Sequence, residues 1–215
     1  MVERLGWILM GIAVLMGQAG CLAPRASEGP PHTYFLSLDD QTWGTDARMG
    51  EKAGDQVLLI NLPQAEAGFD TPKIAYLRRP LEVSYYATNQ WADTPSRMLI
   101  PLLVRTFEKT GRWRAVIPMP TPVRGDYRLE TTGLVLQQEF LQQPSRVRVA
   151  VRAQLVDLRD YRALGARLFE VIEPAASDDA YGGVLAANKA LTKLLQDVAG
   201  CGNGCVGESG RSHCP

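Results

Sequence analysis

Few side chains in this chain are suited to catalysis or metal binding, and most of those lie near its ends. The 215 residues include two histidines, His32 and His213, and four cysteines. A Ser-His-Asp or Cys-His arrangement works only when its members are held in register. Both histidines lie outside the segment that we expect to fold, so the sequence indicates a protein that is not an enzyme. It has no glycine-rich loop of the phosphate- or dinucleotide-binding type, and we expect no cofactor.

Three of the cysteines, Cys201, Cys205 and Cys214, lie with His213 in a glycine-rich C-terminal segment. Three thiolates and an imidazole form a ligand set that structural zinc sites use. An oxidising compartment favours a disulfide or unpaired thiols instead. We therefore expect no metal site, and the pairing of the three thiols stays open.

The fourth cysteine, Cys21, ends a segment that is typical of a secretory signal. Arg4 provides a short basic start, residues 5–16 are apolar, and Ala19-Gly20 precede the cysteine. This arrangement is similar to the lipobox of lipoproteins, in which the cysteine is acylated and becomes the first mature residue. We expect residues 1–20 to be a signal peptide and Cys21 to carry the lipid.

Two other interpretations of this N-terminal segment stay open. Ordinary cleavage after Ala19 would use Gly17 and Ala19 as its pair of small residues. An uncleaved membrane anchor is the third interpretation, because residues 5–23 carry no charge and are about long enough to span a bilayer. Gln18 occupies a lipobox position at which Leu is usual, which bears on how efficiently the signal would be processed.

The residues after Cys21 predict where the protein is sorted and how it is attached. Leu22, rather than Asp, follows the cysteine, and in Gram-negative lipoproteins this favours the outer membrane over retention in the inner membrane. Residues 21–32 are rich in Pro, Ser, Gly and Ala. Such a composition cannot build a core, so we expect a flexible tether.

Residues 33–199 predict one domain of the α/β class, a mixed β-sheet packed by two main amphipathic helices. Strands are expected where apolar or alternating runs lie between turn residues, at 33–38, 57–62, 74–77, 81–86, 113–117, 127–141, 146–158 and 167–172. The continuous apolar run at 57–62 indicates a central strand buried on both faces. Alternation from Val147 to Ala153 indicates a strand with one buried face.

The first helix is expected after a turn at residues 89–95. Pro95 suits its first position, and apolar spacing extends it to Gly111. Pro101 predicts a kink or a later start, because proline lacks the N–H that a helix interior requires.

The second helix is expected to begin near Ser177-Asp178-Asp179, which provide a cap, and to end at Gly200. Its buried face is expected to be lined by Tyr181, Val184, Leu185, Asn188, Leu191, Leu194, Leu195 and Val198. Residues 200–215 then form a Gly/Cys-rich tail. Because this tail has almost no apolar residues, we expect it to be flexible and dispensable for folding.

Charge excludes one class of partner. The 23 Lys and Arg residues balance the 23 Asp and Glu residues, so nothing steers the chain toward nucleic acid. The arginines of Arg78-Arg79 and of the face formed by Arg146, Arg148 and Arg152 are interpreted as solvated rather than as an anion site.

Several segments, taken in order, resemble the ABC-type transport auxiliary lipoprotein family. The resemblance rests on Tyr34-Phe35-Leu36, on residues 72–80, on Gln90 to Pro95 with the helix that follows, and on Ala186 to Leu191. The lipoprotein signal agrees with it. The sequence departs from the family pattern at Gln18, at Pro101 and in the Cys-rich tail.

The resemblance implies a non-catalytic lipoprotein on the periplasmic face of the outer membrane. It would be an auxiliary component of an ABC/MCE-type intermembrane lipid transport system. Its partners would be the MCE-domain protein of an ABC lipid transporter and the membrane that holds its lipid anchor, and self-association into a homo-oligomer stays open. The alternatives are another envelope assembly or secretion lipoprotein, or an unrecognised periplasmic enzyme.

Overall fold

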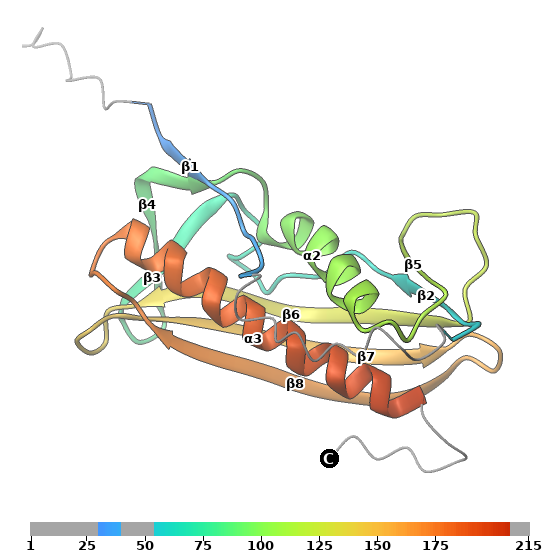
Figure 1. Ribbon diagram of the computed structural model, residues 1–215. Helices are drawn as coiled ribbons and strands as arrows, with labels where there is room; N and C mark the ends of the chain where they lie inside the picture. The colour runs from blue at the N-terminus through green and yellow to red at the C-terminus, as the bar shows by residue number, and fades with distance from the viewer. Residues whose placement is uncertain (1–29, 40–53, 207–215) are drawn as a thin grey trace, which may run out of the picture. The chain divides into compact units, whose positions relative to one another are not determined.

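A computed structural model describes residues 30–39 and 54–206, which contain eight strands and two helices around one core (Figure 1). The elements are β1 (His32–Tyr34), β2 (Val57–Ile60), β3 (Lys73–Arg79), β4 (Glu82–Trp91), α2 (Pro95–Lys109), β5 (Ala115–Pro118), β6 (Tyr127–Glu139), β7 (Arg146–Asp157), β8 (Arg162–Pro174) and α3 (Ala180–Val206). The predicted α/β class, with one mixed sheet and two helices, is confirmed. The predicted signal peptide and Cys21 lie outside the described residues.

Strand β6 is the centre of the hydrogen bonding in the sheet. One of its edges pairs antiparallel with β7, and β7 pairs antiparallel with β8. Its other edge is divided between β2, which pairs in parallel with its first residues, and β3, which pairs in parallel with its last. β5 extends the sheet beyond β2, and β4 and β1 extend it beyond β3.

Both helices pack on one face of this sheet, as Figure 1 shows, with α3 along β7 and β8 and α2 against β5 and β2. Leu103 and Phe107 of α2 and Leu194 and Leu195 of α3 are almost fully buried. Each such side chain contributes about 1.5–3 kcal/mol through removal from water. All four residues of β2 are buried, which confirms the prediction from the apolar run. Within the described residues, no helix is both long and apolar enough to cross a bilayer.

Helix α2 begins at Pro95, directly after Thr94, whose extended backbone marks the end of the preceding segment. The alternative of a later start is therefore wrong. Pro101 lies inside the helix without ending it. Arg97 and Pro101 are both exposed, so water can bind the Arg97 carbonyl, which lacks a helical partner.

Most strand limits differ from the predictions, and the differences are largest in β4, β8 and β1. For β4 and β8, pairing with strands distant in sequence explains the difference. Residues 89–91 are not a turn but the end of β4, where β1 pairs with them. Strand β8 begins at Arg162 rather than at 167, since β7 pairs with its whole length. Strand β1 begins at His32 and ends at Tyr34, so the strand predicted at 33–38 begins one residue too late and ends four residues too late.

Helix α3 continues through Gly200 to Val206, so the predicted boundary between domain and tail is wrong. Contacts with α2 and the loop after it hold the additional turns. Gly202 is buried where an added Cβ would lie 3.1 Å from the ring of Phe107. Trp113 Nε1 donates a hydrogen bond to Asn203 Oδ1 (3.2 Å), and Arg112 donates one to the Val206 carbonyl (3.1 Å). The second bond satisfies a carbonyl that the end of a helix leaves unpaired.

These contacts predict that residues 201–206 stabilise the domain. A chain that ends after Gly200 should lose about 2–4 kcal/mol of unfolding free energy, because it loses the packing on α2 and both hydrogen bonds. The control is a chain that ends after Val206, which should keep the free energy set by the complete α3. Urea denaturation of both chains makes the comparison, and equal midpoints would contradict the prediction.

Candidate functional site

Of the side chains that the sequence singled out for chemistry, the described residues include His32, Cys201 and Cys205, and only the two cysteines lie together. Among the described residues there is no group of three or more His, Cys, Asp and Glu side chains that could hold a metal ion. Cys201 and Cys205 lie one turn apart on α3, half-buried, and line a pocket of about 20 Å³ against β7 and β8. His32 is exposed at the start of β1, on a different element. His213 and Cys214, like Cys21, lie outside the described residues.

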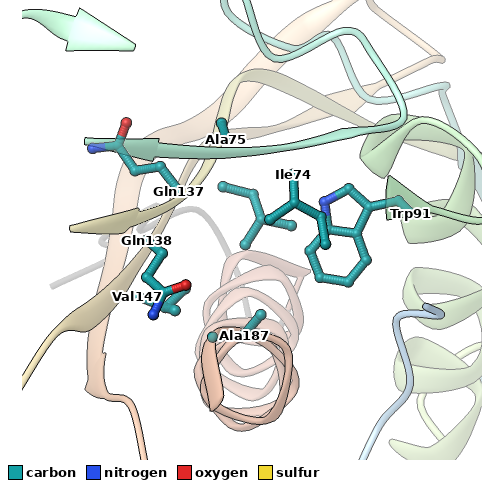
Figure 2. Close-up of a pocket in the computed structure, with 9 residues that line it drawn as sticks. Ile74, Ala75, Trp91, Gln137, Gln138, Val147 and Ala187 are labelled. Atoms are coloured by element: carbon teal, nitrogen blue, oxygen red, sulfur yellow. The ribbon is translucent and has the colours of Figure 1, made fainter. Parts of the chain in front are cut away.

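A second pocket lies between the first turns of α3 and the sheet (Figure 2). In this view Ile74 and Trp91 lie above the helix, and Ala187 points toward them from the helix. The pocket has a volume of about 10 Å³, which is room for about one water molecule. Neither of these two pockets has space for an organic ligand.

A chain of hydrogen bonds fixes the start of α3 beside this second pocket. Tyr86 donates to Gln138 Oε1 (2.9 Å), Gln138 Nε2 donates to Ser145 Oγ (2.9 Å), and the Ser145 backbone N–H donates to Asp178 Oδ1 (2.8 Å). Gln138 is buried, and Gly183 makes room for it, since a Cβ there would lie 2.3 Å from its Oε1. Buried polar groups that are fully paired favour a single arrangement. This network therefore sets where α3 lies on the sheet.

The predicted cap of α3 is confirmed, and the charge of its carboxylate affects the pKa of Tyr86. Asp179 Oδ1 accepts a hydrogen bond from the backbone N–H of Gly182 (2.7 Å), which lowers the pKa of Asp179. Burial raises the pKa of Tyr86 to about 12, and the negative charge of Asp179 adds to this increase. The hydroxyl of Tyr86 consequently stays protonated and remains a hydrogen-bond donor at neutral pH.

Residues 35–39, here called the strap, run along α3 without forming a strand. Leu36 and Leu38 point into the core. The backbone N–H of Ser37 donates to Asn188 Oδ1 (2.7 Å), and that of Asp39 donates to Thr192 Oγ1 (3.0 Å). Asn188 was predicted to lie on the buried face of the helix, and its hydrogen bond to the strap was not predicted. Two polar residues four positions apart in an otherwise apolar face are the signal that indicates it.

An open groove of about 370 Å³ lies between the strap and α3. It is lined by Ser37, Leu38, Asp39, Pro174, Ala176, Leu185, Ala186, Asn188 and Lys189. Phe35, Tyr181 and Leu185 beside it are 69%, 58% and 40% exposed, and we call the groove with these three residues the strap groove. Exposed apolar groups beside polar ones are typical of surfaces that bind other proteins.

The opposite face of the sheet carries a network of charges. Glu139, which is buried, accepts hydrogen bonds from Arg146 Nε (2.9 Å) and Arg148 Nε (2.6 Å), and Arg148 also pairs with Glu170. Burial acts to raise the pKa of Glu139, but the hydrogen bonds from Arg148, Gln137 and Arg146 outweigh it and lower that pKa. Arg146 and Arg148 are thus paired with carboxylates, and their side chains are only 28% and 27% exposed. The prediction of a solvated face is therefore wrong for these two arginines and holds for Arg152, which is exposed.

Comparison with known proteins finds a family model that matches most of the chain. The model of the ABC-type transport auxiliary lipoprotein component matches residues 37–199, which include Ser37 to Asp39 of the strap and most of α3. No curated protein matches the sequence.

Solved structures share the fold. Protein XCC0632 from Xanthomonas campestris is 23% identical, with a TM-score of 0.66 over 82% of this chain and 94% of that one. An uncharacterized protein is 13% identical, with a TM-score of 0.59 over 79% and 97% of the two chains. The hypothetical protein CT253 from Chlamydia trachomatis is 8% identical, with a TM-score of 0.51 over 71% and 98%.

The raised pKa of Tyr86 predicts how stability depends on pH. An unfolded tyrosine loses its proton near pH 10, whereas Tyr86 in the folded domain loses it near pH 12. Its contribution is therefore complete below pH 10 and is lost as the pH rises from 10 to 12. Because the side chain is only half-buried, we expect a loss of about 1–2 kcal/mol.

Denaturation at a series of pH values checks this in Tyr86→Phe. The variant should be less stable than the wild type at pH 7, since Gln138 loses a donor, and should show a flatter decline above pH 10. Tyr161→Phe, at an exposed tyrosine, controls for loss of a hydroxyl. An unchanged slope in Tyr86→Phe would contradict the assignment.

Proposed function

The chain belongs to the family of ABC-type transport auxiliary lipoprotein components, and from this membership we propose its role in the cell envelope. The protein is acylated at Cys21 and held on the periplasmic face of the outer membrane. There it assists an ABC/MCE-type lipid transport system by binding the MCE-domain protein, without catalysing a reaction. The match to the family model across residues 37–199 is the observation that carries this proposal.

The length of the tether supports a role that depends on a partner. Ten residues separate Cys21 from His32. At roughly 3.3–3.6 Å per extended residue, they reach about 35 Å from the lipid at most. A domain held this close to one membrane cannot carry a lipid to the other membrane alone. It requires a partner that extends across the space between them.

We infer that the partner docks at the strap groove. Its apolar residues are exposed, although Tyr181 and Leu185 were expected on the buried face of the helix. They lie four residues apart and so share one face of α3. The hydrogen bonds from the strap to Asn188 and Thr192 hold the groove in shape without a ligand. A preformed surface of this kind loses little conformational entropy when a partner binds.

The proposed anchor predicts the form of the mature protein. Membrane-extracted protein should begin at Cys21 and carry added acyl mass, measured by intact-protein mass spectrometry. Two or more chains suffice for stable attachment, whereas one is marginal. In Cys21→Ala the protein should leave the membrane or remain as an uncleaved precursor. A mature N-terminus at Gly20, or an intact Met1 in the wild type, would refute the anchor.

The proposed docking surface predicts which positions crosslink to the partner in cells. Photoreactive residues at Tyr181 and Leu185 should form adducts with an MCE-domain protein. The same residue at Leu168, which is 60% exposed on β8, is the matched control and should form few. Adducts at the groove that contain only an outer-membrane β-barrel or a peptidoglycan enzyme would favour an envelope assembly lipoprotein instead.

A further inference from the structure

The turn between β3 and β4 places a leucine where nothing in the fold uses it. Leu81 is completely exposed, with a relative accessibility of 101%. Its backbone has a φ of 66°, in the left-handed region that favours glycine and asparagine. The side chain buries no surface in the domain, and the backbone conformation costs stability. Such a residue is either strained or functional, and the groups around it distinguish the two cases.

The charges around Leu81 indicate the chemistry of its partner. Arg78 and Arg79 precede the turn and are exposed, and the guanidinium of Arg78 lies over the rings of Tyr76 (5.7 Å) and Phe140 (5.5 Å). Glu82 is the one acid in the turn, and it lies 3.7 Å from Arg79 in an exposed pair that contributes little. An apolar apex flanked by cations fits a layer of anionic lipid headgroups with hydrocarbon beneath it.

A second exposed leucine beside the turn also favours a bilayer over a protein. It lies in the neighbouring connection after β6. The backbone N–H of Phe140 donates to the Leu77 carbonyl (2.8 Å), so the two connections lie side by side, and Leu141 is 43% exposed. Protruding leucines beside cations partition into an interface without needing a complementary pocket.

The anchor proposed above brings the turn within range of the membrane, and this step depends on the proposed function. Strand β4 runs ten residues from Glu82 at the turn to Trp91 beside β1, which is about 33 Å at 3.3 Å per residue. Ten residues of fully extended chain would reach a comparable distance, about 35 Å. A domain anchored through residues 21–31 can therefore lie against the bilayer with the turn in contact with it.

We infer that the β3–β4 turn is a membrane-contact element that inserts Leu81 into the interface of an anionic bilayer while Arg78 and Arg79 bind its headgroups. The lipid anchor attaches the chain, and the turn orients the domain against the surface. The strap groove is then presented in a defined direction.

The test uses the full chain reconstituted into vesicles of phosphatidylglycerol and phosphatidylethanolamine. Benzoylphenylalanine is placed at Leu81 or, as the matched control, at Tyr161. Tyr161 also has a positive φ (58°) and is 77% exposed, in the β7–β8 turn. After illumination, lipid adducts at position 81 should exceed those at 161 by about tenfold or more, as insertion of a leucine-sized side chain implies. They should decrease in phosphatidylcholine vesicles.

A second variant separates function from folding. Leu81→Asn should keep or raise the thermal midpoint, because asparagine tolerates the positive φ, and should weaken protection of the turn from protease on the vesicles. Equal lipid adducts at 81 and 161, or adducts at 81 only with protein, would overturn the membrane contact. If the wild-type chain does not float with the vesicles, the anchor fails and the inference with it. Flotation without adducts at 81 overturns the inference alone.

Discussion

Strand β6 is shared by two groups of strands that do not pair with each other, and the rest of the domain depends on how it divides between them. β2 pairs with the first residues of β6, and β3 pairs with its last residues. The register with β7 shifts between Thr132 and Val135, where Gly133 has a φ of 65°. An added Cβ there would also lie 3.2 Å from Glu66 Oε1. This irregularity lets one long strand bend between its two sets of partners, and both helices pack on the surface that results.

Local signals predicted the elements whose limits depend on neighbouring residues. The alternation of Val147, Val149 and Val151 identifies β7, and Asp179 identifies the start of α3, because each pattern is satisfied within a few residues. The order of the predicted elements gave the α/β class, which the structure confirms. The resemblance to the family was confirmed separately by the match to the family model. Local signals did not predict the limits of elements that are set by a partner distant in sequence. Residues 89–91 extend β4 only because β1 pairs with them.

The end of α3 and the strap show the same limit. Gly200 favours a helix stop when it is considered alone, yet Trp113 and Arg112 bind the helix beyond it, at Asn203 and Val206. Asn188 appeared to be one more member of an apolar face, and it is the side chain that holds the strap. The groove arises from this pairing of segments about 150 positions apart, so periodicity within either segment could not reveal it.

The way in which the chain enters the domain determines how the domain bears mechanical force. A pull on the residues before His32 acts first on β1, whose three residues pair in parallel with β4. It then acts on the strap, whose backbone is hydrogen-bonded to two side chains of α3. The load is shared between the sheet and the helix over eight consecutive residues, and Leu36 and Leu38 are buried among them. A force on the N-terminal segment therefore meets a distributed resistance and does not peel away one exposed strand.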